Sequence, residues 1–213
     1  MKGIVTGANG GIGSAICRRL KEAGYLPLTL TSRLENLEAV EKEVTVLLRE
    51  HSDIAFVINA AGIGIFEPME TISLSTIQRL IAVNLTAPVV LAKLLLPTLK
   101  VNGGTIVNIT SIEALRASKY SALYSASKAG LRHFSHTLFE EVRKSNVRVC
   151  TINPDVTDTP FFENNRLKFR PMKGDEYAVN PNEIAQAVLT VLQSKSAITD
   201  ITLRPQKVGI QKR

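Results

Sequence analysis

The sequence predicts a single α/β domain of 213 residues, built on a doubly wound parallel sheet. Short apolar runs rich in β-branched residues alternate along the chain with segments of helical periodicity. A glycine-rich stretch follows the first apolar run directly, and the chain is long enough for one full-sized core. Alternating strands and helices favour a parallel sheet with helices on both faces, and right-handed crossovers then wind the sheet doubly.

The expected elements follow from this alternation. Strands are expected at Gly3–Thr6, Leu26–Thr31, Ile54–Asn59, Thr105–Thr110, Val147–Asn153 and Ala197–Leu203. Helices are expected at Ile12–Ala23, Leu34–Glu50, two segments within Ser73–Lys100, Ala122–Lys144 and Pro181–Gln193. In the second of these helices, apolar side chains recur at the three- and four-residue spacing of one helix face.

Composition and charge exclude several classes of protein. The net charge is +7, but the basic residues are scattered and no basic run is interleaved with aromatic residues, so we expect no nucleic-acid partner. The apolar stretch 86–99 is interrupted by Lys93 and Pro97 and falls short of the ~20 residues of a membrane span, so we expect no membrane partner. Cys17 and Cys150 are expected to be buried thiols, and no Cys/His cluster has metal-site spacing, so we expect no metal. Without a signal-peptide pattern at its start, the chain is expected to be cytoplasmic.

A glycine-rich loop, TGANGGIG at 6–13, lies between the first strand and the first helix. Gly7 permits a tight turn, Gly11 lets a pyrophosphate approach the main chain, and Gly13 lets the helix pack close to the strand. The main-chain N–H groups and the helix dipole favour a phosphate here, so we predict a dinucleotide site. The other loop residues assigned to it are Asn9 and Ile12. A glycine-rich turn without a ligand is the alternative.

The end of the second strand bears on the choice of cofactor. Ser32 lies 19 residues after Gly13, where an acidic residue would bind the adenosine ribose hydroxyls of NAD. Ser32 is neutral and Arg33 follows it, and a guanidinium can bind a 2′-phosphate through two hydrogen bonds. These residues predict a preference for NADP. The alternative is a surface arginine at the start of the next helix.

Several further motifs follow in order along the chain. NAAG at 59–62 ends an expected strand, Asn84 lies in VNLT, and Ser111 ends VNITS, 13 residues before Tyr124. Tyr124-x-x-x-Lys128 follows, and then NPDVTDTPF at 153–161. Together with TGANGGIG, this ordered set resembles the short-chain dehydrogenase/reductase family over nearly the whole chain.

The resemblance implies a Rossmann-like fold, a nicotinamide cofactor and assembly as a homodimer or homotetramer. The residues that it places at the cofactor, beyond the glycine loop, are Asn59, Ala60, Ala61, Gly62, Tyr124, Lys128, Pro154, Val156 and Thr159. The residues that it makes catalytic are Ser111, Tyr124, Lys128 and Asn84. It also implies that Lys128 holds the nicotinamide ribose and that Asn84 positions a water that relays protons.

The chemistry of the tyrosine and lysine fits this resemblance. Tyr124 and Lys128 stand four apart and share one face of the expected helix. A free phenol has a pKa of ~10 and a nearby cation lowers it, so Lys128 is expected to tune Tyr124 for proton transfer. Ser111 would hydrogen-bond the substrate oxygen that receives the proton from Tyr124, and would stabilise the charge on that oxygen. Each residue alone could be an ordinary helix or strand residue, but their joint order and spacing favour catalysis.

The chain departs from the family pattern in three places. One is Gly10, which stands where many NADP-preferring members have a basic residue, so the NADP preference would rest mainly on Arg33. Only 25 residues separate Arg33 from Asn59, and the expected helix 34–50 uses most of them. A third strand would need a second helical crossover of ~10–12 residues, and too few residues remain for it. We therefore predict that the family's third strand is missing or vestigial. Asp53 is then a weak candidate for the aspartate on the adenine side. Asp155 replaces a family glycine, where it would either disfavour an anionic cofactor group or point to solvent.

Residues 157–180 show no clear helix or strand pattern, and a loop at about 155–180 is expected to close over the substrate by resemblance. The side chains that would form an apolar wall are Phe161, Phe162 and Phe169. Those that would meet an anionic or carrier-linked substrate are Arg166, Lys168 and Arg170. A surface loop with scattered charges is the alternative, and the basic tail 207–213 is expected to be solvated.

We therefore predict an NADP-dependent oxidoreductase that transfers a hydride between the cofactor and a carbonyl or secondary-alcohol substrate. An NAD-dependent dehydrogenase of the same family is one alternative. A catalytically weak dinucleotide-binding regulatory protein is another, motivated by the shortened adenine side. The set Ser111, Tyr124, Lys128 and Asn84 favours the enzyme.

Overall fold

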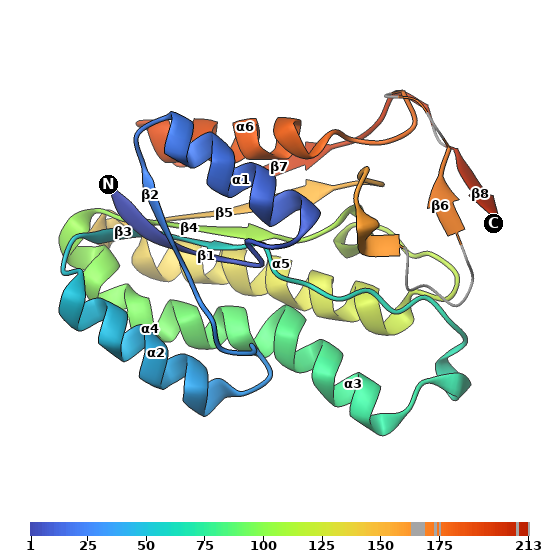
Figure 1. Cartoon of the computed structure of the whole chain (residues 1–213), viewed down its shortest axis with the longest axis horizontal. Helices are drawn as coiled ribbons and strands as arrows, with labels where there is room; N and C mark the ends of the chain where they lie inside the picture. Colours follow the sequence, from blue (N-terminus) through green and yellow to red (C-terminus); the bar gives the residue numbers. More distant parts are fainter. Residues whose placement is uncertain (163–168, 173, 175, 208, 213) are drawn as a thin grey trace.

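The structure, a computed structural model, describes residues 1–162, 169–172, 174, 176–207 and 209–212. Within these residues, the centre of the fold is a parallel sheet of six strands in the order β2-β1-β3-β4-β5-β7 (Figure 1). The strands are β1 (Lys2–Thr6), β2 (Leu26–Thr29), β3 (Ile54–Asn59), β4 (Thr105–Ile109), β5 (Arg148–Pro154) and β7 (Asp200–Leu203). Helices alternate with these strands, which confirms the doubly wound α/β prediction.

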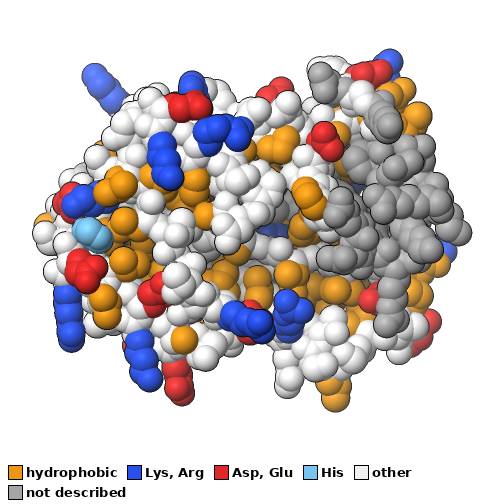
Figure 2. Space-filling view, in the orientation of Figure 1, with side chains coloured by type: hydrophobic (Ala, Val, Ile, Leu, Met, Phe, Trp, Pro, Cys, Tyr) orange, Lys and Arg blue, Asp and Glu red, His pale blue; other side chains and the backbone are white. Residues whose placement is uncertain are grey.

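Helices cover both faces of the sheet. The helices on one face, above the sheet in Figure 1, are α1 (Gly11–Glu22) and α6 (Pro181–Gln193). Those on the other face are α2 (Leu37–Glu50), α4 (Ala87–Asn102) and α5 (Ala122–Val142). Neighbouring strand residues point to opposite faces, so Val5 packs toward α1 and α6 while Ile4 packs toward α2 and α4. The two resulting apolar cores hold the three layers together. On the face shown in Figure 2, basic side chains are interspersed with acidic ones.

The third strand of the family pattern is missing, as predicted. A single helix, α2, connects β2 to β3, so β2 forms one edge of the sheet. Val40 and Val44 of α2 are fully buried and pack in the same core as Leu91 of α4. Asp53 precedes β3 and pairs with Lys2 at 3.1 Å, at the amino end of the sheet. The suggestion that Asp53 serves the adenine side is therefore wrong, because that site lies at the carboxyl end.

The two helical segments predicted within Ser73–Lys100 are present as α3 (Leu74–Ile81) and α4, which follow one another in one continuous helical run. α3 passes through a π-helical turn, Ala82–Thr86, directly into α4. By length and composition alone this 29-residue run could cross a membrane. The sequence-based expectation considered only the stretch 86–99, which is too short to do so. Its apolar window is 44% buried inside the protein, because one side of the run packs on the sheet as a core helix does.

A short antiparallel pair forms outside the main sheet. β6 (Phe169–Pro171) pairs with β8 (Ile210–Lys212), so the prediction of an irregular segment is wrong at residues 169–171. Three-residue strands are too short to leave a periodic pattern in the sequence. Among the predicted substrate contacts, Arg166 and Lys168 lie outside the described residues, as do the side chains of Phe162, Phe169 and Arg170.

Candidate active site

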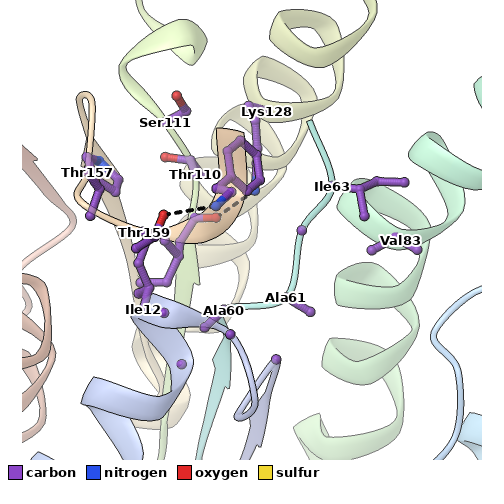
Figure 3. Close-up of a pocket in the computed structure, with 18 of the residues that line it drawn as sticks. Ile12, Ala60, Ala61, Ile63, Val83, Thr110, Ser111, Lys128, Thr157 and Thr159 are labelled. Carbon is purple, nitrogen blue, oxygen red and sulfur yellow. Dashed lines mark hydrogen bonds between the residues drawn. The ribbon is translucent and has the colours of Figure 1, made fainter. Parts of the chain in front are cut away.

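A cavity of about 1200 Å³ lies at the carboxyl ends of the strands. The strand order reverses between β1 and β3, which is where ligands bind in open α/β sheets. In Figure 3, Ile12, Ala60 and Ala61 lie on one side of this cavity, and Ser111 and Lys128 lie on another. The cavity is therefore framed by segments that are far apart in the sequence.

Most of the predicted site residues meet in this cavity. Those that line it are Gly7, Asn9, Gly11, Ile12, Gly13, Ser32, Ala60, Ala61, Gly62, Ser111, Tyr124, Lys128, Pro154, Val156 and Thr159. Three predicted residues are not part of its lining. Arg33 is exposed to solvent beside it. Asn59 is buried and donates from Nδ2 to Asn108 Oδ1 at 2.7 Å, and Asn84 is fully buried.

The glycine loop has a shape that side chains would destroy. Gly7 has φ of +69°, a left-handed conformation that favours glycine, and its N-terminal turn closes with a hydrogen bond from Gly10 N to Gly7 O at 2.9 Å. A Cβ on Gly13 would lie 2.0 Å from Gly7 O, so the loop and helix α1 pack without space between them. A Cβ on Gly11 would lie 2.5 Å from the Thr159 side chain, which faces the loop across the cavity. The exposed start of α1 thus offers its N–H groups to a phosphate.

At the end of β2, a carboxylate holds the chain. Glu43 of α2 accepts hydrogen bonds from Thr31 N at 2.7 Å, Thr31 Oγ1 at 2.9 Å and Ser32 N at 2.9 Å. Burial raises the pKa of Glu43, but the hydrogen bonds from Thr31 and Ser32 outweigh it, so the net pKa is lowered and the group is ionised at neutral pH. Glu35 and Arg79 line the same end of the cavity and form an ion pair at 3.6 Å.

Tyr124 and Ser111 meet in the cavity. Tyr124, on α5, and Ser111, which follows β4, both line the cavity, and the Ser111 side chain acts on the pKa of the phenol. Burial raises the pKa of Tyr124 to about 12; the hydrogen bond with Ser111 lowers it in part, and the charge of Glu113 raises it. The prediction that Lys128 lowers this pKa is therefore wrong. The Lys128 ammonium lies 5.9 Å from the ring centroid, and the desolvation of the phenol dominates.

Lys128 is also buried, at 4% exposure. Its Nζ donates to the main-chain oxygen of Ile109 at 2.9 Å, and a Cβ on Gly62 would lie 3.2 Å from it. Burial lowers the pKa of Lys128 from 10.5 to about 8, so its charge is sensitive to pH in the neutral to mildly alkaline range. Gly62 of the NAAG segment thus leaves room for this side chain.

Asn84 supports the segment after β3 from the π-helical turn. Its Oδ1 accepts from Ile63 N at 2.9 Å, and its Nδ2 donates to Ile63 O at 2.9 Å and to Ser127 Oγ at 3.1 Å. The side chain therefore fixes Ile63, which lines the cavity, to the helix that carries Tyr124. The π-helical turn is a local widening of the kind that proteins use at functional sites.

Aromatic rings cover Tyr124. The ring centroids of Phe66 and Phe161 lie 5.1 Å and 5.9 Å from that of Tyr124, and all three side chains line the cavity. A Cβ on Gly64 would lie 2.6 Å from the Phe161 ring, so glycine at this position lets the ring approach. The Tyr124 ring therefore has aromatic rings on one side.

Acidic and basic groups lie on another side of the cavity. Glu113 accepts from Ser118 Oγ and Ser121 Oγ, each at 2.8 Å, and pairs with Arg116 at 3.2 Å. Asp155 is 8% exposed, and pairs with Arg116 at 3.4 Å and with Arg204 Nε at 3.0 Å. Asp155 therefore does not point to solvent, as one of the two sequence-based alternatives had it, and two arginines balance its charge.

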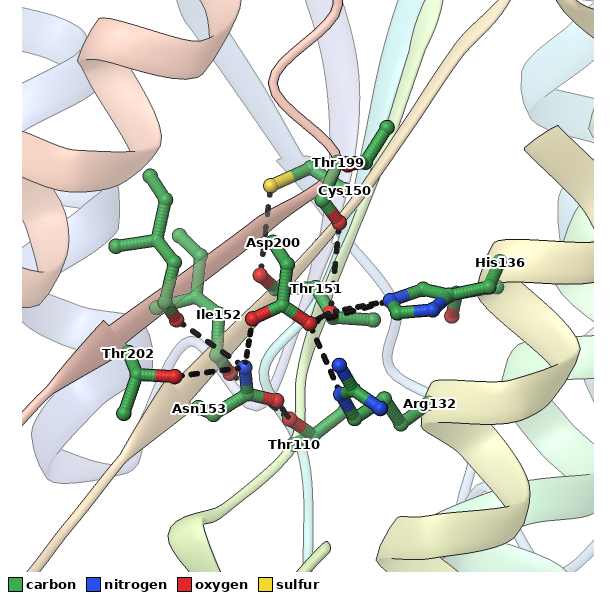
Figure 4. A network of polar contacts seen from close by, with 12 residues as sticks. Thr110, Arg132, His136, Cys150, Thr151, Ile152, Asn153, Thr199, Asp200 and Thr202 are labelled. Atoms are coloured by element: carbon green, nitrogen blue, oxygen red, sulfur yellow. Dashed lines mark hydrogen bonds and ion pairs between the residues drawn. The ribbon is translucent and has the colours of Figure 1, made fainter. Parts of the chain in front are cut away.

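A polar network joins the Ser111 strand end to helix α5 (Figure 4). Asp200 Oδ2 accepts from Arg132 Nε at 2.9 Å and Thr151 Oγ1 at 2.8 Å, and lies 3.1 Å from His136 Nε2. Its Oδ1 accepts from Asn153 Nδ2 at 2.7 Å, and Asn153 Oδ1 accepts from the Thr110 hydroxyl. The network ties the strand end next to Ser111 to the helix that carries Tyr124.

Sequence reasoning missed several residues of this cavity. Arg79, Glu35 and Glu113 line it, and Asp200 supports it from β7. Arg79 and Glu35 are 44 positions apart, and neither is in a recognisable motif. Glu113 follows Ser111 by two residues, so its proximity to the motif serine was the one available signal.

Comparisons with known proteins agree with this arrangement. A family model described as short chain dehydrogenase matches residues 34–169. An uncharacterized oxidoreductase of Staphylococcus saprophyticus is 30% identical, and the match covers 95% of this chain and 96% of that protein. An alcohol dehydrogenase from the archaeon Thermococcus sibiricus, complexed with 5-hydroxy-NADP, is 25% identical with a TM-score of 0.84, over 97% of this chain and 98% of that chain.

A second solved structure extends the comparison. A 4-hydroxyisoleucine dehydrogenase complexed with NADH is 26% identical with a TM-score of 0.82, over 95% of this chain and 97% of that chain. The strand order, the cavity at the switch point and the ordered motifs have the arrangement that the resemblance implied. The chain belongs to the short-chain dehydrogenase family and is an NAD(P)-dependent oxidoreductase.

Proposed function

We propose that this chain is an NADP(H)-preferring reductase that acts on a carbonyl group, or on the corresponding secondary alcohol in reverse. The observation that carries this function is the meeting of Tyr124, Ser111 and Lys128 in the cavity that the glycine loop also lines. The cavity thereby combines a phosphate-binding loop with a proton donor. Substrate would enter on the side of Phe66 and Phe161, where the 155–180 region begins to border the cavity.

The residues present fit a dinucleotide. Gly7, Gly11 and Gly13 form a cradle that a Cβ would fill, and the start of α1 favours a pyrophosphate. The residues that would hold the ribose and nicotinamide are Ala60, Ala61, Gly62, Lys128, Pro154, Val156 and Thr159. Ser32 would border the adenosine ribose.

The protein's own groups would handle the proton. When bound, the nicotinamide supplies the hydride for reduction or accepts it in oxidation. In reduction, Tyr124 would donate its phenolic proton to the substrate oxygen as the carbonyl carbon gains the hydride. Ser111 would hydrogen-bond the same oxygen and stabilise its developing charge. A tyrosine with its pKa raised to about 12 is protonated at neutral pH, which is the state that the donor role in reduction requires.

Lys128 and Asn84 would maintain this geometry. The Lys128 side chain lies between the strand end at Ile109 and the Gly62 segment, and would hold the nicotinamide ribose from there. Asn84 would keep Ile63 in position at the cavity wall. The side-chain amide of Asn84 would also be the group that positions a water for proton relay.

The preference for NADP(H) is supported by the basic residues near the end of β2. Arg33 follows Ser32, and Arg79 lines the cavity there. A second candidate, an NAD-dependent dehydrogenase, is favoured by Glu35, because a carboxylate at this end can bind the ribose hydroxyls. The related alcohol dehydrogenase holds an NADP derivative and the 4-hydroxyisoleucine dehydrogenase holds NADH, so both cofactors occur among its structural relatives.

Two measurements test this function. Fluorescence titration with NADPH and NADH is expected to give the lower dissociation constant for NADPH; tighter NADH binding would shift the function to the second candidate. Tyr124→Phe is expected to lower turnover of a carbonyl substrate about 100-fold or more while NADPH still binds. Tyr120→Phe is the matched control, because Tyr120 is exposed on the loop just before α5. Unchanged turnover in Tyr124→Phe would refute the mechanism.

Assembly and location complete the proposal. We propose a homodimer or homotetramer in a reducing cytoplasm, where the free thiols Cys17 and Cys150 persist. The exposed positions of α5 include Ala122, Ala126 and Ala129, small side chains that allow a second copy to approach closely. Light scattering coupled to gel filtration measures the assembly directly, and a monomer at micromolar concentration would contradict it.

A further inference from the structure

The loss of the third strand changes what surrounds the adenosine end of the cavity. In the described part of the chain, β2 is the edge of the sheet and no further strand pairs with it. Helix α3 reaches the β2–α2 connection instead, and Arg79 of α3 pairs with Glu35. Both side chains line the cavity next to Ser32, although 44 positions separate them in the chain.

The main-chain donors at the end of β2 are already engaged. Thr31 N and Ser32 N donate to the Glu43 carboxylate at 2.7 Å and 2.9 Å, and the Thr31 hydroxyl donates to it as well. These groups would otherwise serve a phosphate on the adenosine ribose. The ionised Glu43 carboxylate that these donors bind would repel a phosphate. The end of β2 therefore does not by itself favour binding of a 2′-phosphate.

A cation must therefore come from elsewhere if a 2′-phosphate binds here. Arg33 is exposed and does not line the cavity. Arg79 does line it, and its side chain is 63% exposed and so retains freedom to turn. Its pairing with Glu35, at 3.6 Å and 32% exposure of the glutamate, is of the exposed kind that holds a guanidinium weakly.

We propose that Arg79 determines the preference for NADP(H) by binding the 2′-phosphate, and that Glu35 competes with the phosphate for the same guanidinium. The planar guanidinium suits two-point binding of a phosphate, which is stronger than its single contact with Glu35. Glu35 thereby also limits NADPH affinity. This inference rests on the proposed function, and it assigns the specificity to helix α3 and not to the end of β2.

The test compares dissociation constants for NADPH and NADH across a set of single variants, measured by fluorescence. Arg79→Ala is expected to weaken NADPH binding about tenfold or more and to change NADH binding by less than about twofold, since only NADPH carries the 2′-phosphate. Glu35→Gln is expected to strengthen NADPH binding several-fold. Arg49→Ala, at the exposed far end of α2, removes the same charge away from the cavity and controls for net charge. Because Arg79 and Glu35 are largely on the surface, melting temperatures near wild type are expected.

Four results would overturn the inference. In the first, Arg79→Ala and Arg49→Ala change NADPH binding equally. In the second, Arg33→Ala causes the selective loss of NADPH affinity and Arg79→Ala does not. In the third, Arg79→Ala weakens both cofactors alike. In the fourth, Glu35→Gln weakens NADH, which would place Glu35 on the ribose hydroxyls. The wild-type titration judges the proposed function separately. If wild type prefers NADH but its residual NADPH binding still depends on Arg79, the proposed cofactor preference fails and the inference stands.

Discussion

Lys128 Nζ donates a hydrogen bond to the main-chain oxygen of Ile109 at 2.9 Å. This contact joins the helix that carries Tyr124 to the strand that ends two residues before Ser111. The ammonium is buried, so its proton is held at a cost in solvation. The lysine therefore has both a positional and an electrostatic role, and the two have separate experimental signatures.

The electrostatic role predicts a pH-dependent stability. Burial lowers the pKa of Lys128 from 10.5 to about 8. Between these values the unfolded chain keeps a proton that the folded chain releases, so stability rises with pH in this window. Lys128→Met lacks this contribution. We expect the stability of Lys128→Met relative to wild type to decrease as pH rises from about 8 to about 10, as measured by urea denaturation.

Two features sharpen that measurement. The pKa of Tyr124 is raised to about 12, so its contribution to stability is lost only above pH 10, its ordinary pKa. The titration of Tyr124 therefore does not overlap the range of about pH 8 to 10 in which Lys128 is measured. All other titrating groups are shared by the two proteins and cancel in the difference. If the stability of Lys128→Met relative to wild type stays constant between about pH 8 and 10, or rises, the pKa of Lys128 is not lowered in the folded protein.

The glycine loop predicts a sharp contrast between two helical glycines. Gly13→Ala is expected to abolish NADPH binding, because the new Cβ would lie 2.0 Å from Gly7 O and force the phosphate loop apart. Gly130→Ala is the matched control on α5, since its Cβ would meet only the flexible Leu85 side chain at 3.3 Å. That variant is expected to bind normally and to be stabilised by up to about 1 kcal/mol. Normal NADPH titration of Gly13→Ala would contradict the assigned pyrophosphate site.

The Asp200 network predicts that Arg132, within α5, and Arg143, at the C-cap of α5, differ in importance. Arg132→Ala removes a 2.9 Å hydrogen bond to the Asp200 carboxylate and is expected to lower the free energy of unfolding by about 1–2 kcal/mol. Arg143→Ala removes an exposed pair with Glu140 and is expected to change it by at most about 0.5 kcal/mol. Urea denaturation of both variants makes the comparison. Equal effects would mean that the network adds no stability beyond a surface ion pair.

Asn84 predicts a similar contrast along one helical run. Asn84→Ala removes a fully buried side chain that bonds the part-buried Ile63 N and O and the buried Ser127 Oγ, and is expected to destabilise by about 2 kcal/mol or more. Asn102→Ala also removes hydrogen bonds to main-chain oxygens, of Ser52 and Ile54, but at an exposed position where water can replace them. A loss of about 1 kcal/mol or less is expected there. Thermal denaturation that ranks the two variants in the opposite order would refute the structural role of Asn84.

Local patterns were sufficient for much of the fold and the site. Strand β3 has the predicted bounds, Ile54–Asn59, because its continuous apolar run is buried on both faces. Helix α6 also has its predicted bounds, because Asn180 and Glu183 form a capping box and Pro181 begins the first turn. The missing third strand followed from chain length alone, since 25 residues hold one crossover helix and no more.

By itself, the sequence determined the doubly wound architecture, the phosphate loop and the ordered set Ser111, Tyr124 and Lys128, because each depends on spacing along the chain. Only the tertiary structure decided the properties that depend on burial and on distant partners. It raised the pKa of Tyr124 where spacing to Lys128 had predicted a decrease, because desolvation outweighs a cation that is 5.9 Å from the ring. It brought Arg79 to Glu35 and Asp200 to Asn153, contacts across crossovers for which no local pattern exists.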